Sequence, residues 1–198
     1  MKNVILLGGS GYIGIHLAKM WLQKDSKVVV TSISRSGKPK NLPSYLEDNN
    51  RIKWIAADVF NVDSYISELP VNAYAIVDLI GTATVETDEL FEKINVGPVK
   101  IMIELMDKLF ISNGCYISGV IGMPGKSKPF LRSKQNAEKL IKESKMQIKI
   151  VRPSLVYGDR PEVKAMVPFM KLMGLFKSSY KPVLVDDLSK EIMESFNA

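Results

Sequence analysis

The sequence has few of the residues that build disulfides, metal sites and histidine-dependent catalysis. Its 198 residues include one cysteine, Cys115, and one histidine, His16. A single cysteine excludes an internal disulfide and fits a reducing compartment. A single histidine cannot supply both a catalytic triad and a metal site, and we interpret His16 as structural. We therefore predict no metal site.

Long apolar runs are absent as well. No stretch reaches the roughly 18 apolar residues that a membrane-spanning helix needs, so we expect no transmembrane segment. The first predicted strand lies at the very start of the sequence, which leaves no room for a signal peptide. Hydrophobic residues make up 46% of the chain and charged residues 24%, enough for one well-packed domain. We expect a cytoplasmic protein.

The net charge of +6 is unevenly placed, because the whole excess lies in residues 101–198. One interpretation is an acidic partner, such as nucleic acid or an anionic membrane. The other is a solvated surface with a few cations for an anionic cofactor. Scattered rather than clustered basic residues favour the second interpretation, so we expect no nucleic-acid partner.

The chain starts with a short apolar strand, a glycine-rich turn and a helix. Residues 4–7 are apolar and partly β-branched, and helical spacing of apolar residues continues to about residue 24. Glycines let a backbone approach a ligand closely, and a helix N-terminus attracts anions, so this arrangement predicts a pyrophosphate site. An ordinary strand–helix turn is the alternative. The predicted phosphate-binding residues are Gly8, Gly9, Ser10, Gly11, Tyr12, Ile13 and Gly14.

A second strand, residues 27–33, is followed by Ser34, Arg35 and Ser36 instead of an acidic residue. At this position a dinucleotide-binding fold contacts the adenine ribose, and an acid there would select NAD. A guanidinium suits the extra phosphate of NADP, with Lys38 as a helper. We predict NADP(H) in preference to NAD(H). The alternative is that Arg35 only begins a solvated loop.

Two further strands end in residues suited to the same ligand. Strand 51–58 runs into Asp58 and Val59, which we place near the adenine ring. Strand 73–80 runs into Gly81 and Thr82, where small side chains let a cofactor pass close to the backbone. A short helix is predicted over 61–69.

Strand and helix patterns continue to alternate. A helix over 89–110 contains Gly97 and Pro98, so we expect a break near Gly97. Two more strands, 115–118 and 147–151, flank a helix over 130–144. This alternation predicts an α/β fold, a Rossmann-type doubly wound parallel sheet of six or seven strands. Such sheets bind ligands at the carboxyl ends of their strands.

The character of the chain changes after residue 158. We predict a nucleotide-binding domain over 1–158 and a reduced C-terminal cap over 159–198 that is not an independent domain. Residues 166–176 form a methionine-rich apolar stretch. Such side chains line a pocket for an apolar substrate or a membrane-facing surface, or pack on the core or a second subunit. The last segment, 182–196, predicts a strand remnant and a terminal helix.

In these motifs the chain resembles the extended or atypical branch of the short-chain dehydrogenase/reductase superfamily, the epimerase/dehydratase-like type. The resemblance covers nearly the whole chain. Residues 34–38 and 53–58 are also similar to a narrower group, which contains the NAD(P)H-binding subunit of respiratory complex I and a protein of ubiquinone biosynthesis. The segments that carry the wider resemblance are 8–14, 58–59, 95–97, 133–138, 152–158 and 182–187.

The resemblance implies a catalytic pair and shows where this chain departs from it. The family uses a tyrosine and, four residues later, a lysine that holds the nicotinamide ribose. Lys134 matches the lysine, whereas Phe130 stands at the tyrosine position and cannot donate a proton. Ser118 is the nearest candidate for the serine that orients the substrate. Pro153 belongs to a motif beside the cofactor.

The resemblance also implies the function classes. The chain is expected to bind NADP(H) and to act as an oxidoreductase or epimerase-type protein on a small apolar substrate. The alternative is a non-catalytic module that senses NADPH or stabilises a complex, since the usual acid is missing. The short C-terminal part leaves room for a homodimer or a partner that closes the cleft.

Overall fold

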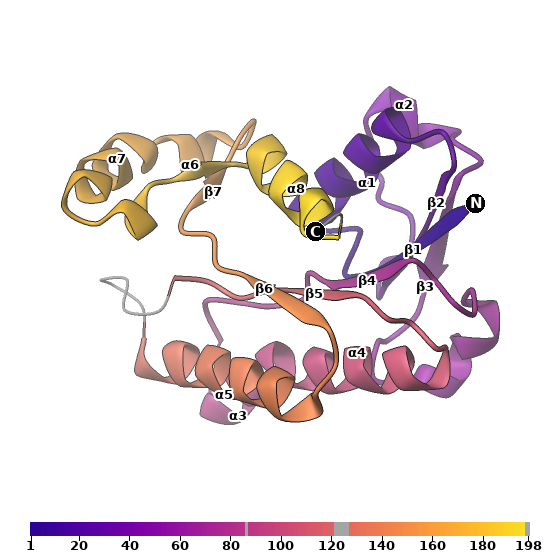
Figure 1. Ribbon diagram of the computed structural model, residues 1–198. Coiled ribbons are helices and arrows are strands. Elements are labelled where there is room, and N and C mark those ends of the chain that lie inside the picture. Colours follow the sequence, from indigo (N-terminus) through magenta and orange to yellow (C-terminus); the bar gives the residue numbers. More distant parts are fainter. Residues whose placement is uncertain (86, 121–126, 197–198) are drawn as a thin grey trace.

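A computed structural model describes residues 1–85, 87–120 and 127–196 (Figure 1). Its centre is a six-stranded parallel sheet in the order β3-β2-β1-β4-β5-β6. The chain crosses from one half of the sheet to the other after β3, which is the doubly wound topology predicted above. The strands are β1 (Lys2–Leu7), β2 (Val28–Ser34), β3 (Ile52–Ala56), β4 (Ala75–Asp78), β5 (Gly114–Ile117) and β6 (Ile148–Val151).

Helices cover both faces of the sheet. Figure 1 shows α3 (Asp88–Asn95), α4 (Gly97–Lys108) and α5 (Lys128–Ser144) on one side, and α1 (Tyr12–Lys24) and α8 (Val185–Glu194) on the other. A short helix, α2 (Ser44–Glu47), lies beyond α1. The Rossmann-type fold is therefore confirmed, with six strands in its sheet.

Strand β1 shows why an unbroken apolar run was needed. Ile5 and Leu7 join the core under α4, whereas Val4 and Leu6 join the core under α1. All four side chains have no exposed surface. A strand buried on both faces has no position for a polar residue, so it cannot show the alternation of a half-exposed strand.

One local prediction differs from the structure and another is confirmed. Residues 61–69 form two 3₁₀ turns, η1 (Val62–Ser64) and η2 (Ile66–Glu68), instead of one α-helix. Each turn has three residues and the tighter winding of a 3₁₀-helix, and Val62, Tyr65 and Leu69 are buried in this conformation. The break near Gly97 is confirmed, because α3 ends at Asn95 and α4 begins at Gly97.

The C-terminal part contributes directly to the core. Leu188 and Ile192 of α8 have no exposed surface and pack in the same cluster as Leu17 of α1. The rings of Trp21 and Phe196 stack with their centroids 6.0 Å apart. Residues at both ends of the chain thus bury one face of the sheet together.

Between β6 and α8 the chain forms small elements outside the main layers (Figure 1). Two short parallel strands pair with each other rather than with the main sheet. The second is the strand remnant predicted at the start of 182–196, whereas the first was not predicted. No helix in the described ranges has both the length and the apolarity needed to cross a membrane. The elements are β7 (Val156–Tyr157), α6 (Pro161–Lys164), α7 (Val167–Phe176), η3 (Ser178–Tyr180) and β8 (Val183–Leu184).

Candidate functional site

The glycine turn connects β1 to α1 with very little space around it. Gly8 has φ +80, and a Cβ there would lie 2.8 Å from the side chain of Ile80. A Cβ on Gly9 would lie 2.5 Å from the hydroxyl of Ser32, and one on Gly14 would collide with the backbone of Gly9. The turn therefore requires glycine at three positions.

The N-terminus of α1 has no side chain that satisfies its amide groups. Its N-cap is Gly11, no side-chain cap is present, and no acidic residue lies in its first turn. The amide of Gly11 donates to the carbonyl of Gly8, which closes the turn at 3.0 Å. Free amides and the positive end of the helix dipole together form an anion site.

Tyr12 points away from this turn. Its hydroxyl accepts a hydrogen bond from the amide of Asp159, and its ring packs edge-on to His16. The guanidinium of Arg160 lies 4.1 Å from the centre of the ring. Burial is the main reason that the pKa of Tyr12 is raised. A hollow of about 280 Å³ beside α1 is lined in part by these side chains.

The end of β2 lies next to the glycine turn. The hydroxyls of Ser10 and Ser36 are 3.1 Å apart, so the two predicted segments meet. Gly37 has φ +60 and completes the turn after the strand. Arg35 is exposed, and no ion pair to it occurs in the described ranges. Lys38, in contrast, donates to the carbonyl of Glu47.

The residues after β3 build a short turn. The carboxylate of Asp58 accepts a hydrogen bond from the amide of Phe60, and Val59 is buried. The hydroxyl of Tyr65 donates to the carbonyl of Val59. These contacts hold the end of β3 at the same edge of the sheet as the glycine turn, since the strands are parallel.

Asn95 fastens the segment after β4 to helix α5. Its side chain accepts from the amide of Thr82, and donates both to the carbonyl of Thr82 and to the hydroxyl of Ser133. Asn95 and Ser133 are fully buried. The network places the backbone of Gly81 directly beside α5. Asparagine suits the last residue of α3, because its side chain readily hydrogen-bonds to nearby backbone groups.

Lys134 extends under this segment. Its ammonium group donates to the hydroxyl of Tyr116 at 3.0 Å and to the carbonyl of Ile117 at 3.3 Å. A Cβ on Gly81 would lie 3.1 Å from the Lys134 nitrogen. Burial lowers the pKa of Lys134, while the charges of Asp78 and Glu138 oppose that shift.

Two residues of this buried cluster were not among the predicted site residues. Asp78, at the end of β4, is fully buried; one oxygen accepts from the amide of Ile80, and the other has no partner in the described ranges. Burial raises its pKa, and the Lys134 charge opposes the shift. The second residue is Tyr116, whose hydroxyl donates a hydrogen bond to the carbonyl of Asn95. An acid inside an apolar strand was the available signal for Asp78.

Phe130 lies one helical turn before Lys134, in the first turn of α5. Its amide donates to the N-cap residue Ser127, and its side chain is buried. The ring meets Phe91 edge-on at 6.3 Å between centroids and approaches Gly119. The side chain at this position is therefore part of an apolar contact, and it carries no ionisable group.

The hydroxyl of Ser118 points to an acid rather than to an open site. It donates to a carboxylate oxygen of Glu138 at 2.8 Å, and Arg152 binds the same carboxylate through two nitrogens at 2.9 and 2.6 Å. Burial opposes ionisation of Glu138, but the hydrogen bonds from Arg152 and Ser118 outweigh it and lower the pKa. The hydroxyl proton of Ser118 is thus used in a hydrogen bond to the Glu138 carboxylate.

The last predicted position, Pro153, follows β6. Its carbonyl accepts a hydrogen bond from the amide of Val120, which joins the ends of β5 and β6. No group of three or more potential metal ligands occurs among the residues that the structure describes. The strands that precede the predicted site residues are parallel, so their carboxyl ends lie at one edge of the sheet.

Comparisons with known proteins agree with this arrangement. The model of the NAD dependent epimerase/dehydratase family matches residues 4–172. A probable UDP-arabinose 4-epimerase 3 from Arabidopsis thaliana is 28% identical over 190 residues, covering 82% of this chain and 46% of the plant protein. The UDP-glucose 4-epimerase of Vibrio cholerae is 27% identical over 195 residues, covering 88% of this chain and 56% of that enzyme.

Solved structures share the fold at lower identity. UDP-glucuronic acid 4-epimerase from Bacillus cereus, in complex with NAD, has a TM-score of 0.75 at 19% identity, covering 98% of this chain and 74% of that chain. ADP-L-glycero-D-manno-heptose-6-epimerase from Helicobacter pylori has a TM-score of 0.73 at 19% identity, covering 100% and 74%. The chain spans about half the length of the curated relatives. It belongs to the NAD dependent epimerase/dehydratase family, the extended short-chain dehydrogenase/reductase type that its motifs resemble.

Proposed function

We propose that the protein binds NADP(H) along the carboxyl edge of the sheet. The glycine turn carries the proposal, because side chains at Gly8, Gly9 and Gly14 would collide with the surrounding protein, so only glycine permits this tight turn between β1 and the N-terminus of α1. The uncapped amides of α1 offer hydrogen bonds to a pyrophosphate at the same place. The NAD complex of the related Bacillus cereus epimerase supports a nicotinamide dinucleotide as the ligand.

The choice of NADP(H) rests on the end of β2. Arg35 is exposed there beside Ser36, whose hydroxyl contacts Ser10 of the glycine turn. No acidic residue follows β2 before Glu47. A guanidinium offers a planar fork of donors to a phosphate, and the absence of a nearby carboxylate removes the usual partner for a free 2′-hydroxyl.

Lys134 would serve the other end of the cofactor. Its ammonium group lies beneath Gly81, where it would donate to a ribose hydroxyl. When bound, the nicotinamide supplies or takes up a hydride, so the substrate would be a small apolar carbonyl compound or its alcohol. Tyr116 accepts a hydrogen bond from Lys134, and the charge of Asp78 raises the pKa of Lys134 against the effect of burial. The proton would come from water, since Phe130 has none to give.

A second candidate is a non-catalytic NADPH-binding module that senses the cofactor or stabilises a complex. Two contacts favour it. The ring of Phe130 is buried against Phe91 where the family has a tyrosine. The hydroxyl of Ser118 donates to Glu138 instead of facing outward. Both differences affect substrate chemistry and leave the glycine turn unaltered.

Calorimetric titration with NADPH and NADH tests the binding proposal. We expect NADPH to bind more tightly, and Arg35→Ala to weaken NADPH about tenfold or more while leaving NADH unchanged, since a charge-assisted hydrogen bond contributes about 1.5–3 kcal/mol. Lys40→Ala is the matched control, because Lys40 is an exposed cation in the same loop. Equal affinities for the two nucleotides would show that Arg35 does not select the cofactor.

Oxidation of NADPH against a panel of carbonyl compounds and quinones tests the chemistry. Turnover by the unmodified protein would support the oxidoreductase and exclude the module. Turnover only after Phe130→Tyr would identify a decayed oxidoreductase, in which the restored phenol lies one turn from Lys134. Tight NADPH binding without turnover in either protein would favour the module.

A further inference from the structure

Helix α7 presents an apolar face to solvent. Its side chains Phe169, Leu172, Leu175 and Phe176 are 62%, 55%, 78% and 82% exposed, and Met166, just before the helix, is 53% exposed. We call these five residues the α7 patch. Exposed apolar residues scattered singly are ordinary, but a contiguous patch marks an interaction surface.

The patch lies on the side of the helix that should be polar. Val167, Met170 and Gly174 form the buried face, with Gly174 packed on the stem of Lys181. At 3.6 residues per turn, Phe169, Leu172 and Phe176 project from the opposite side. Helix α5 follows the usual rule, because its exposed positions, among them Arg132, Lys139 and Glu143, are charged or polar. In α7 both faces are apolar, and the outer one is exposed in the part of the chain that the structure describes.

The segment that carries the patch is basic. Between Glu162 and Asp186 the sequence has four lysines and no acidic residue. All four lysines are exposed, and the long stem of such a side chain can follow an apolar surface while its ammonium group reaches polar headgroups. The four are Lys164, Lys171, Lys177 and Lys181, of which Lys181 packs its stem on Gly174 at the buried face and is not part of the rim.

We propose that the α7 patch binds the surface of a bilayer that contains anionic lipids. Apolar side chains at the centre and lysines at the rim match the acyl boundary and the headgroups of such a surface. Helix α7 lies at one end of the molecule, away from the main sheet, so it can meet a flat surface (Figure 1). Contact is peripheral, since no described helix can span a membrane.

A second copy of the chain fits the patch less well. In a twofold dimer the same surface faces itself, so the lysine rim of one chain would meet the lysine rim of the other. No carboxylate of the segment would lie between them, and like charges across an interface are unfavourable. The charge pattern thus favours a negatively charged lipid surface.

Flotation of the full chain with vesicles tests the proposal. We expect binding to phosphatidylcholine vesicles that contain phosphatidylglycerol, weaker binding at high salt, and little binding to phosphatidylcholine alone. The double variant Phe169→Ser/Phe176→Ser should lower the partition coefficient about tenfold or more, because two aromatic rings that would be buried in the lipid are lost. Phe110→Ser is the control, as Phe110 is 72% exposed and lies outside the patch.

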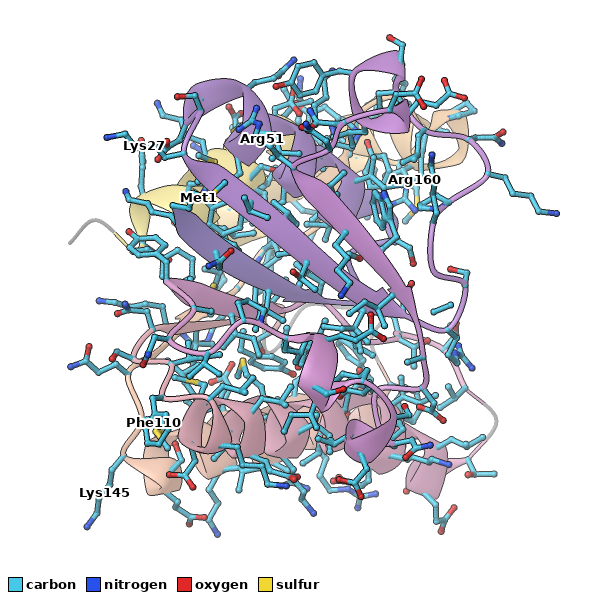
Figure 2. All side chains as sticks on the ribbon, turned by 90° about the vertical axis from the view of Figure 1, so that its right-hand side faces the viewer. Met1, Lys27, Arg51, Phe110, Lys145 and Arg160 are labelled. Carbon is cyan, nitrogen blue, oxygen red and sulfur yellow. The ribbon has the colours of Figure 1, made fainter. Side chains whose placement is uncertain are left out.

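Charge variants separate the electrostatic part. Lys164→Gln/Lys171→Gln should lower binding to anionic vesicles about 30-fold, at about 1 kcal/mol for each lysine. Lys145→Gln is the matched control. Figure 2 shows Lys145 and Phe110 at the opposite side of the molecule from Arg160, which directly precedes α6.

Three outcomes would overturn the proposal. The first is no binding to either kind of vesicle. The second is equal binding to both kinds, which would remove the role of anionic lipid. The third is a dimer in sedimentation that dissociates on Phe169→Ser/Phe176→Ser, which would assign the patch to a second copy. NADPH affinity and the melting temperature of each variant report whether the fold is intact, and NADPH affinity tests the proposed function separately.

Discussion

Replacing Glu138 by glutamine tests the buried network between β5, α5 and β6. The side chain of Glu138 is 7% exposed, and that of Arg152 is 43% exposed. Glu138→Gln removes the charge that accepts two hydrogen bonds from Arg152 and one from Ser118. Removing one partner of a fully buried ion pair costs about 3–5 kcal/mol. Because Arg152 is half exposed and can turn to water, we expect the free energy of unfolding to fall by only about 2 kcal/mol at neutral pH.

The stability difference between the wild-type chain and Glu138→Gln depends on pH, because the carboxylate of Glu138 titrates. The folded pKa of Glu138 lies below its ordinary value of 4.5. A depressed acid stabilises the fold above its unfolded pKa, and this contribution is lost as the pH falls through the folded pKa. The difference between the wild-type chain and Glu138→Gln should therefore be full at neutral pH and shrink in acid, where both side chains are neutral.

Urea denaturation at several pH values measures the difference in the free energy of unfolding. At neutral pH the melting temperature should also fall by roughly 4 to 8 °C for a chain of this size. Glu143→Gln is the control, since Glu143 lies on the same helix and forms an exposed ion pair with Lys139. Equal effects of the two variants, or a difference that persists unchanged at about pH 2–3, would refute the reasoning.

Two other predictions concern the glycine turn and the buried thiol. Gly14→Ala places a methyl group against the backbone of Gly9. We expect the free energy of unfolding, measured by urea denaturation, to fall by at least about 2 kcal/mol, and calorimetry to show loss of NADPH binding. Wild-type NADPH affinity in this variant would contradict the close packing of Gly14 on Gly9. Cys115 is buried, which raises the pKa of its thiol to about 12. Alkylation of this thiol at mildly alkaline pH should therefore proceed only as fast as local unfolding exposes it. Rapid labelling of the native chain would contradict this burial.

Sequence reasoning was strongest where neighbouring residues decide the structure. The apolar run of β1, the glycine turn and the start of α1 follow one another within the first fourteen residues. The break between α3 and α4 follows from Gly97 and Pro98, because proline fits the first turn of a helix and cannot continue one. The turn from 61 to 69 was less clear, because a short apolar pattern fits an α-helix and 3₁₀ turns alike.

The candidate site was predictable in part. The glycine turn between β1 and α1 follows from spacing along the chain, and the choice of Lys134 follows from the family motif. The roles of Arg35, Lys134, Phe130 and Ser118 stay predictions that the experiments above address. Asp78 could have been singled out as the acid in an apolar strand, whereas nothing near Tyr116 in the sequence indicates that its hydroxyl meets Lys134.

Local pattern, then, determined the fold class and the glycine turn between β1 and α1. Only the tertiary structure decided that Ser118 donates to Glu138, that Lys134 lies between Asp78 and Tyr116, and that α8 packs on α1. These contacts join residues far apart in the chain, and they form because the sheet brings its strand ends together and leaves buried polar groups only one another as partners.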